Sequence, residues 1–298
     1  MFSIGRVSAA DAGEVTPSGV RAVMKGRSLQ VDITLEFSEH LFANERSKGL
    51  CRVLEKFLSV EEVTVRFPGH RRRMQTIPLD DELLTKAFLI QKSRGIDGQV
   101  EVTPEDAQSA LVSDDSLEIS ALEGKVVIAT ASHPKRSHLI QGRLIPANGM
   151  LISLLNSGLP AAGNCWLEFV DALAESVRPW YMFACATDEY DANNMDLSYG
   201  MRAIGVDYNK GLPGFYHYNF FSSRLAQQVI RRDALTRLSA FDCVRVLEGG
   251  VAVHVGTWPL DWSTEGYRSL RETAFAVVDR DLFFERDVSK PGRQLCFE

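Results

Sequence analysis

The sequence predicts an α+β protein with antiparallel or mixed sheets and packed helices. Short segments of alternating apolar residues lie beside segments with helical spacing, and the two kinds do not alternate regularly along the chain. Glycine and proline turn signals join neighbouring strand-like segments, which is typical of hairpins rather than of a doubly wound fold. At 298 residues and 45% hydrophobic composition, the chain can bury a large core without disulfides or a structural metal.

The elements of the first half follow from the spacing of its apolar residues. A period of two predicts strands at 28–37, 62–67, 125–131 and 138–145. Helical spacing predicts helices at 40–58 and 80–91, and the apolar run 148–156 is interpreted as a short helix. We expect residues 1–157 to form an N-terminal α+β domain of unrecognised type, followed by a linker at Gly158–Pro160.

The second half repeats a loose order of helix, strand and hairpin. Residues 165–177 predict an amphipathic helix and 180–186 a buried strand, while 188–199 is interpreted as a polar loop with a helical turn. An aromatic turn and strand, two short helical pieces, a hairpin and a closing helix are expected at 211–221, 225–230, 233–239, 243–255 and 263–278. We expect 164–298 to be a second α+β domain, and the shared order is compatible with two similar halves.

Composition argues against several classes of protein. The net charge of −6 disfavours direct binding of nucleic acid, which usually needs a basic face. The five cysteines are widely spaced without a zinc pattern, which favours reduced thiols. The N-terminal segment lacks the apolar core of a signal peptide, and no apolar run approaches the ~20 residues that span a bilayer. We therefore expect a cytoplasmic protein that does not enter a membrane.

The sharpest charge asymmetry lies between residues 97 and 123. This stretch carries eight acidic residues, and no Lys or Arg occurs between Arg94 and Lys125. Such runs are usually solvated loops and helix faces. The alternative interpretation is an anionic surface that attracts a basic partner.

The search for catalytic motifs leaves one alternative. Phosphate-binding glycine loops, a nucleophile elbow and HExxH are absent from the sequence. Asp115, Glu123 and Lys125 resemble the D…ExK pattern of metal-dependent nucleases, in which carboxylates hold Mg²⁺ and a lysine assists the attacking water. Gly124 separates the last two at the start of a predicted strand, and the surrounding charge is acidic, so we expect a binding protein without a cofactor rather than an enzyme.

Three segments of the second half resemble the immunity proteins of bacterial polymorphic toxin systems. They are the strand Trp180–Phe183 with the acidic residues after it, the segment Gly211–Phe221, and the Gly-Gly hairpin Leu247–Val251 with Thr257-Trp258-Pro259. Their order and spacing over residues 164–280 are similar to the family called immunity protein fifty-two and to its relatives from type VI secretion loci. Where those relatives often have a Trp, this chain has His217.

The resemblance implies a protein that binds a cognate secreted toxin and occludes its active site. A cytosolic toxin of these loci is often a nuclease, whose basic substrate groove suits an acidic partner. We expect the toxin-binding carboxylates in the acidic stretch 97–123 and among the acidic residues that follow the strand Trp180–Phe183. They are Asp106, Asp114, Asp115, Glu118, Asp188, Glu189 and Asp191. The alternatives are the metal-dependent nuclease above and an accessory component of a secretion system.

Overall fold

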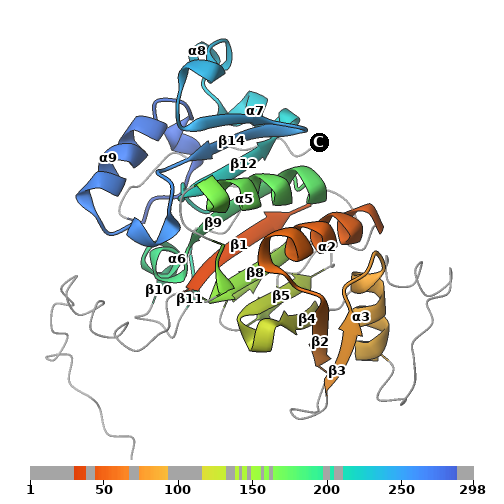
Figure 1. The fold of residues 1–298 in the computed structure, drawn as a ribbon. Helices are drawn as coiled ribbons and strands as arrows, with labels where there is room; N and C mark the ends of the chain where they lie inside the picture. The colour runs from red at the N-terminus through yellow and green to blue at the C-terminus, as the bar shows by residue number, and fades with distance from the viewer. Residues whose placement is uncertain are drawn as a thin grey trace, which may run out of the picture.

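The computed structural model describes an α+β protein (Figure 1). The description covers residues 30–37, 44–66, 74–92, 116–131, 138–140, 143–145, 149–155, 158–160, 164–196, 202–204 and 211–286. Its α-helices are α2 (Asn44–Leu58), α3 (Leu83–Lys92), α5 (Asn164–Val177), α6 (Thr187–Asn194), α7 (Ser223–Val229), α8 (Arg232–Leu235) and α9 (Glu265–Ala274). The short 3-10 turns that matter below are η1 (Leu122–Gly124) and η4 (Pro259–Asp261). The predicted fold class is confirmed.

One large antiparallel sheet organises these elements. Its strands run in the order β13 (Val244–Leu247), β14 (Gly250–His254), β12 (Tyr218–Ser222), β9 (Tyr181–Ala186), β1 (Gln30–Glu36), β8 (Gly149–Leu155), β5 (Val126–Ala131), β4 (Ser116–Ala121), β2 (Glu62–Arg66) and β3 (Met74–Pro78). Two small sheets pair β6 (His138–Ile140) with β7 (Arg143–Ile145), and β10 (Met195–Asp196) with β11 (Arg202–Ala203).

Strand β1 joins the two halves of the chain. It pairs along one edge with β8, where Ile33 lies opposite Ile152, and along the other with β9, where Ile33 lies opposite Ala184. Strands from before and after the predicted boundary at 157–164 therefore belong to one sheet. The division into two domains at this point stays a prediction.

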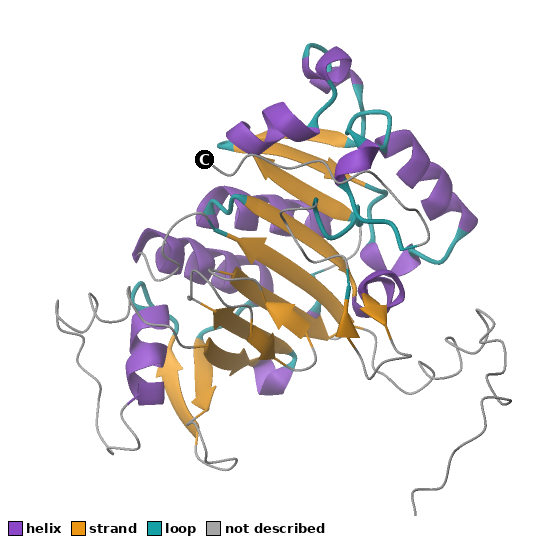
Figure 2. Ribbon diagram, turned by 180° about the vertical axis from the view of Figure 1, so that it is seen from behind, coloured by secondary structure: helices purple, strands orange, loops and turns teal. Residues whose placement is uncertain are grey.

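The two faces of the sheet are covered by different helices. Helices α2, α3 and α5 pack on one face (Figure 1), where they form a core with inward side chains of both halves. On the opposite face (Figure 2), helices α6, α7 and α9 cover the part formed by β9, β12 and β14. This second core is rich in aromatic rings, and it belongs entirely to the C-terminal half.

Asp32 links three elements at the middle of the sheet. Its side chain is 2% exposed and lies on the face opposite α2 and α5. One carboxylate oxygen accepts a hydrogen bond from Ser153 on β8 at 2.7 Å, and the other accepts one from Thr187 at 2.8 Å. Because Thr187 is the first residue of α6, Asp32 fixes where that helix starts relative to β1.

Several expected elements need correction. Within the predicted helix 148–156, Gly149–Leu155 form strand β8 instead, since Met150, Ile152 and Leu154 face the helical layer while the residues between them face the other way. An apolar run that is buried on both faces cannot be assigned from its period. Residues 138–140 and 143–145 form two short strands where one was expected, and 187–194 is a helix. Strands β3 and β4 were not expected.

The Gly249-Gly250 hairpin is confirmed, and its two glycines have different roles. Gly249 has φ of +88°, in the region that glycine adopts most readily, and an added Cβ there would meet nothing within 4 Å. At Gly250 an added Cβ would lie 2.2 Å from the carbonyl oxygen of Phe221 and 2.6 Å from the ring of Phe220. Gly250 is therefore required by packing and Gly249 by backbone conformation.

We expect Gly250→Ala to lower the free energy of unfolding by about 3 kcal/mol or more, because the backbone of β12 cannot move aside. Gly249→Ala, the matched control, should cost only about 1 to 2 kcal/mol through backbone strain. Urea denaturation of both full-length variants measures the difference. Equal losses in the two variants would contradict this account of the hairpin.

Candidate functional site

The predicted acidic surface is only partly visible in the structure. Asp106, Asp114 and Asp115 lie outside the described residues. Glu118 lies on β4, where Leu117 and Ile119 point into the helical core and Glu118 points to the opposite face. A toxin-binding role for these four carboxylates stays a prediction.

The three predicted carboxylates of the second acidic stretch all lie on α6. Asp188 is partly exposed, whereas Glu189 is 2% exposed and Asp191 is 6% exposed. A buried carboxylate does not face a partner, so the burial of Glu189 and Asp191 does not favour their expected role. Sequence reasoning missed this because 188–199 was interpreted as a loop, and α6 has no clear apolar face in its sequence.

Glu123 and Lys125, the two described residues of the nuclease alternative, do not lie inside a strand. Glu123 is exposed in the η1 turn between β4 and β5, with φ of +57°, and Lys125 follows that turn. Asp115 lies outside the described residues. Within the described part of the chain, no group of three His, Cys, Asp or Glu side chains could hold a metal ion. Metal-dependent activity stays an untested alternative.

Helix α6 is instead bound to the segment that leads into α9. The Asp188 carboxylate accepts a hydrogen bond from the indole Nε1–H of Trp262 at 2.9 Å. The adjacent Glu189 accepts one from the hydroxyl of Tyr267 at 2.7 Å. Thr264 caps α9 by accepting a bond from the backbone N–H of Tyr267 at 3.2 Å. Two neighbouring carboxylates thus fasten the start of α9.

Glu189 has an unusual environment for a carboxyl group. Burial raises its pKa to about 8, although the hydrogen bond from Tyr267 and the positive charge of Arg271 both act to lower it. Its second oxygen, Oε2, has no hydrogen-bond partner among the described residues. The carboxyl is therefore largely protonated at neutral pH, because an ion with a free oxygen is costly in the interior.

His217 lies beside the same junction. Its ring stacks at 15° against Tyr267, with centroids 6.5 Å apart, and meets Trp166 edge-on at 6.3 Å. Burial, followed by the nearby His254, lowers the pKa of His217 to about 3. Neither ring nitrogen of His217 bonds to a described protein atom. His254 does have a partner, the carbonyl oxygen of Gly256 at 2.9 Å.

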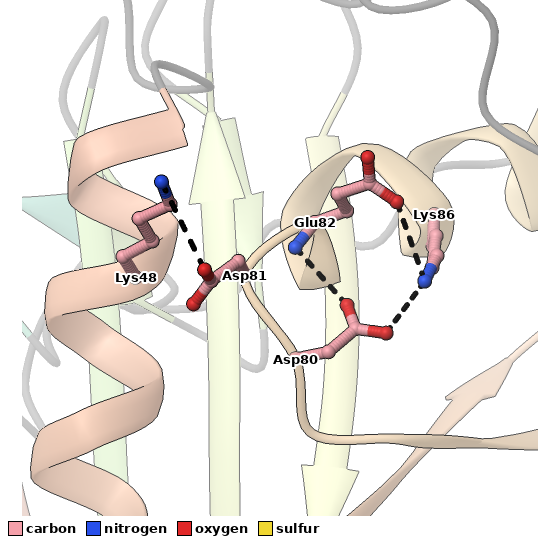
Figure 3. A pocket seen from close by; sticks show the side chains of 5 residues that line it. All are labelled: Lys48, Asp80, Asp81, Glu82 and Lys86. Carbon is pink, nitrogen blue, oxygen red and sulfur yellow. Dashed lines mark hydrogen bonds and ion pairs between the residues drawn. The ribbon is translucent and has the colours of Figure 1, made fainter.

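A separate cavity of about 510 Å³ lies between α2 and the start of α3 (Figure 3). Asp80 stands at its centre and accepts the backbone N–H of Glu82 at 3.0 Å and the Nζ of Lys86 at 2.5 Å. Across the cavity, Lys48 on α2 faces Asp81 at 3.8 Å. Figure 3 shows two groups, the ion pair of Lys48 with Asp81 and the contacts that join Asp80, Glu82 and Lys86. The cluster therefore holds the start of α3 against α2, and its charges are already paired.

Comparison with known proteins gives little further information. No protein-family model matches the sequence, and no curated protein matches it. Among solved structures, the chain is similar to the Pseudomonas aeruginosa T6SS protein PA0821, with a TM-score of 0.48 and 12% sequence identity. The similarity covers 90% of this chain and 79% of that one. Within the described residues, no helix is long and apolar enough to cross a membrane.

We expect Glu189→Gln to change how stability depends on pH. Because the folded state holds the Glu189 pKa near 8, above the ordinary value of 4.5, its contribution is complete below pH 4.5 and is lost as the pH rises through 8. Glutamine cannot ionise and should remove that loss, which amounts to about 3 to 5 kcal/mol. Urea denaturation at pH 5 and pH 8.5 gives the two slopes; parallel slopes for wild type and variant would refute the buried proton.

We expect His217→Phe to reduce the loss of stability as the pH falls, whereas Glu189→Gln reduces the loss as the pH rises. The folded state lowers the His217 pKa from 6.5 to about 3, so its contribution is complete above pH 6.5 and is lost as the pH falls through 3. Phenylalanine removes two unpartnered nitrogens while keeping a stacked ring, and we expect unchanged or higher stability at pH 7 and a smaller loss at pH 4. A destabilised variant at pH 7 would mean that the imidazole has a partner in solution.

Proposed function

We propose that this chain is an immunity protein that binds a cognate secreted toxin and neutralises it by occluding its active site. The observation that carries the proposal is that the three segments of the resemblance lie side by side. Strand β12, which ends the segment Gly211–Phe221, pairs with β9 on one edge and with β14 of the Gly-Gly hairpin on the other. Segments more than 60 residues apart in the sequence therefore form one packed unit.

Side-chain contacts also join these segments to one another. The hydroxyl of Tyr181 on β9 donates to the carbonyl of Gly214 at 3.3 Å. The rings of Phe183 and Tyr216 stack with centroids 4.8 Å apart, and Tyr181 stacks on Phe221 at 5.7 Å. These side chains are buried, so the shared motif belongs to the scaffold. Toxin recognition would then depend on outer surfaces, which can vary while the scaffold is kept.

The toxin is proposed to be a nuclease that acts in the cytosol and is delivered by type VI secretion. The delivery route comes from the resemblance, since the similar immunity families belong to type VI loci. A net charge of −6 supports a basic partner, because opposite potentials accelerate encounter and disfavour wrong pairing. A nuclease fits this requirement because its substrate groove must attract phosphates.

The test is to recover the partner and measure protection. The tagged full-length chain is purified from its native cells, and proteins that co-elute in equal amounts are identified by mass spectrometry. We expect one partner that is encoded next to this chain, kills cells when it is expressed alone, and is harmless when the two are expressed together.

Gly250→Ala provides a control, because a disturbed scaffold should lose protection in proportion to its loss of stability. A co-eluting partner that is not toxic, or a toxic neighbour against which the chain gives no protection, would overturn the proposal. Co-elution with secretion apparatus alone would favour an accessory component instead.

A further inference from the structure

The outer side of the α6–α9 junction combines aromatic and acidic residues. We define the junction surface by Asp188 on α6, by Trp258, Asp261 and Trp262 around η4, and by Glu265 and Leu270 on α9. Asp261 and Glu265 are exposed, Leu270 is 49% exposed, and the two tryptophans and Asp188 are partly exposed. The surface lies beside the buried contacts of Glu189 and Tyr267 described above.

The two tryptophans are held firmly in place. Trp262 is fixed by the hydrogen bond from its indole N–H to Asp188. Trp258 meets the fully buried Trp166 edge-on, with centroids 6.1 Å apart and an angle of 83°. An aromatic side chain that is already ordered loses little conformational entropy when a partner covers it, and tryptophan is the residue most enriched among binding hot spots.

The charged residues around these tryptophans are mostly acidic. Asp188, Asp261 and Glu265 carry negative charge, while α9 also carries the exposed Arg268 and the partly exposed Arg271. No described cation forms an ion pair with Asp261 or Glu265, in contrast to the cavity near α3, where each charge has a partner. Protein interfaces typically have an apolar centre surrounded by a polar rim, and these unpaired carboxylates lie around the tryptophans in that way. Their negative charge is complementary to a positively charged partner surface.

The backbone under the surface is also fixed. The Thr264 cap sets the first turn of α9, and the Tyr267–Glu189 bond ties that turn to α6. Gly256 has φ of +72° and lies close enough to Leu270 that an added Cβ would contact its Cδ1 at 3.4 Å. The loop before η4 therefore lies against α9 at Leu270.

We propose that the junction surface is where this chain binds the positively charged face of its partner protein, with Trp262 and Trp258 as anchors and Asp188, Asp261 and Glu265 as the acidic rim. This inference rests on the proposed function, which supplies the toxin as that partner. It places recognition on α6 and α9 rather than on the acidic stretch 97–123.

Photocrosslinking of the full-length chain in its native cells tests this placement. The photoreactive residue p-benzoylphenylalanine is introduced at Leu270 on the junction surface, at the exposed Glu123 beside the rival acidic stretch, and at the exposed Glu55 on α2. We expect a crosslink from Leu270 to a single basic protein, identified by mass spectrometry, with at least tenfold lower yield from the other two positions.

Substitutions then test the chemistry of the contact. Asp261→Lys combined with Glu265→Lys should lower the crosslink yield from Leu270 at least tenfold, while the matched reversal Glu45→Lys with Glu55→Lys, which also alters the first turn of a helix, should leave it unchanged. Trp262→Ala should lower the yield by about 30-fold. Trp262→Phe keeps a ring but loses the bond to Asp188 and should have an intermediate effect.

Three results would overturn the inference: no crosslink from Leu270, stronger crosslinking from Glu123, or equal effects of the two charge reversals. The outcome for the proposed function is separate. A crosslinked basic protein that is harmless when expressed alone would support this surface and refute the toxin. A toxin that is neutralised but crosslinks only from Glu123 would support the proposed function and refute this surface.

Discussion

Strand β1 is paired along both edges by strands that lie far away in the sequence. Residues 30–36 are held between β8, at 149–155, and β9, at 181–186. Both ladders must form before the inner strands of the sheet have all their backbone partners, because an unpaired strand edge in the interior leaves its N–H and C=O groups unsatisfied. The two halves of the chain therefore depend on one strand near its N-terminal end. Asp32 extends this dependence to α6 through its bonds to Ser153 and Thr187.

The α6–α9 junction is built from groups that are costly to bury, and this explains its rigid geometry. The Glu189 carboxyl, with one oxygen unbonded among the described residues, and the His217 imidazole, with no partner among them, both favour their neutral forms there. Their pKa values move in opposite directions for the same reason, since burial penalises the charged form of each. Two other polar contacts of the junction are hydrogen bonds, from Trp262 to Asp188 and from Tyr267 to Glu189. These contacts fix the start of α9 against α6.

The sequence predicted most local structure and little of the site. Alternation found β1 because Val31, Ile33 and Leu35 enter the core while Asp32 and Thr34 face the other way. The same reasoning failed at β8, since a strand buried on both faces shows no alternation. Glu189 was placed on the surface because charge indicates exposure, and its partner Tyr267 lies 78 residues away, where no local pattern reveals the contact. Of the predicted acidic residues, Asp188 lies on the surface that we propose for binding.

We infer that β1 makes the two halves one cooperative unit, on which the α6–α9 junction depends. Native-state hydrogen exchange of the full-length chain, followed by mass spectrometry of peptides from β1, β8, β9 and β12, measures it most directly. We predict that backbone amides in all four strands exchange with the same free energy of opening, and that this value equals the free energy of global unfolding. Protection of β9 and β12 that persists after β1 and β8 have exchanged would show two independent domains and contradict the claim.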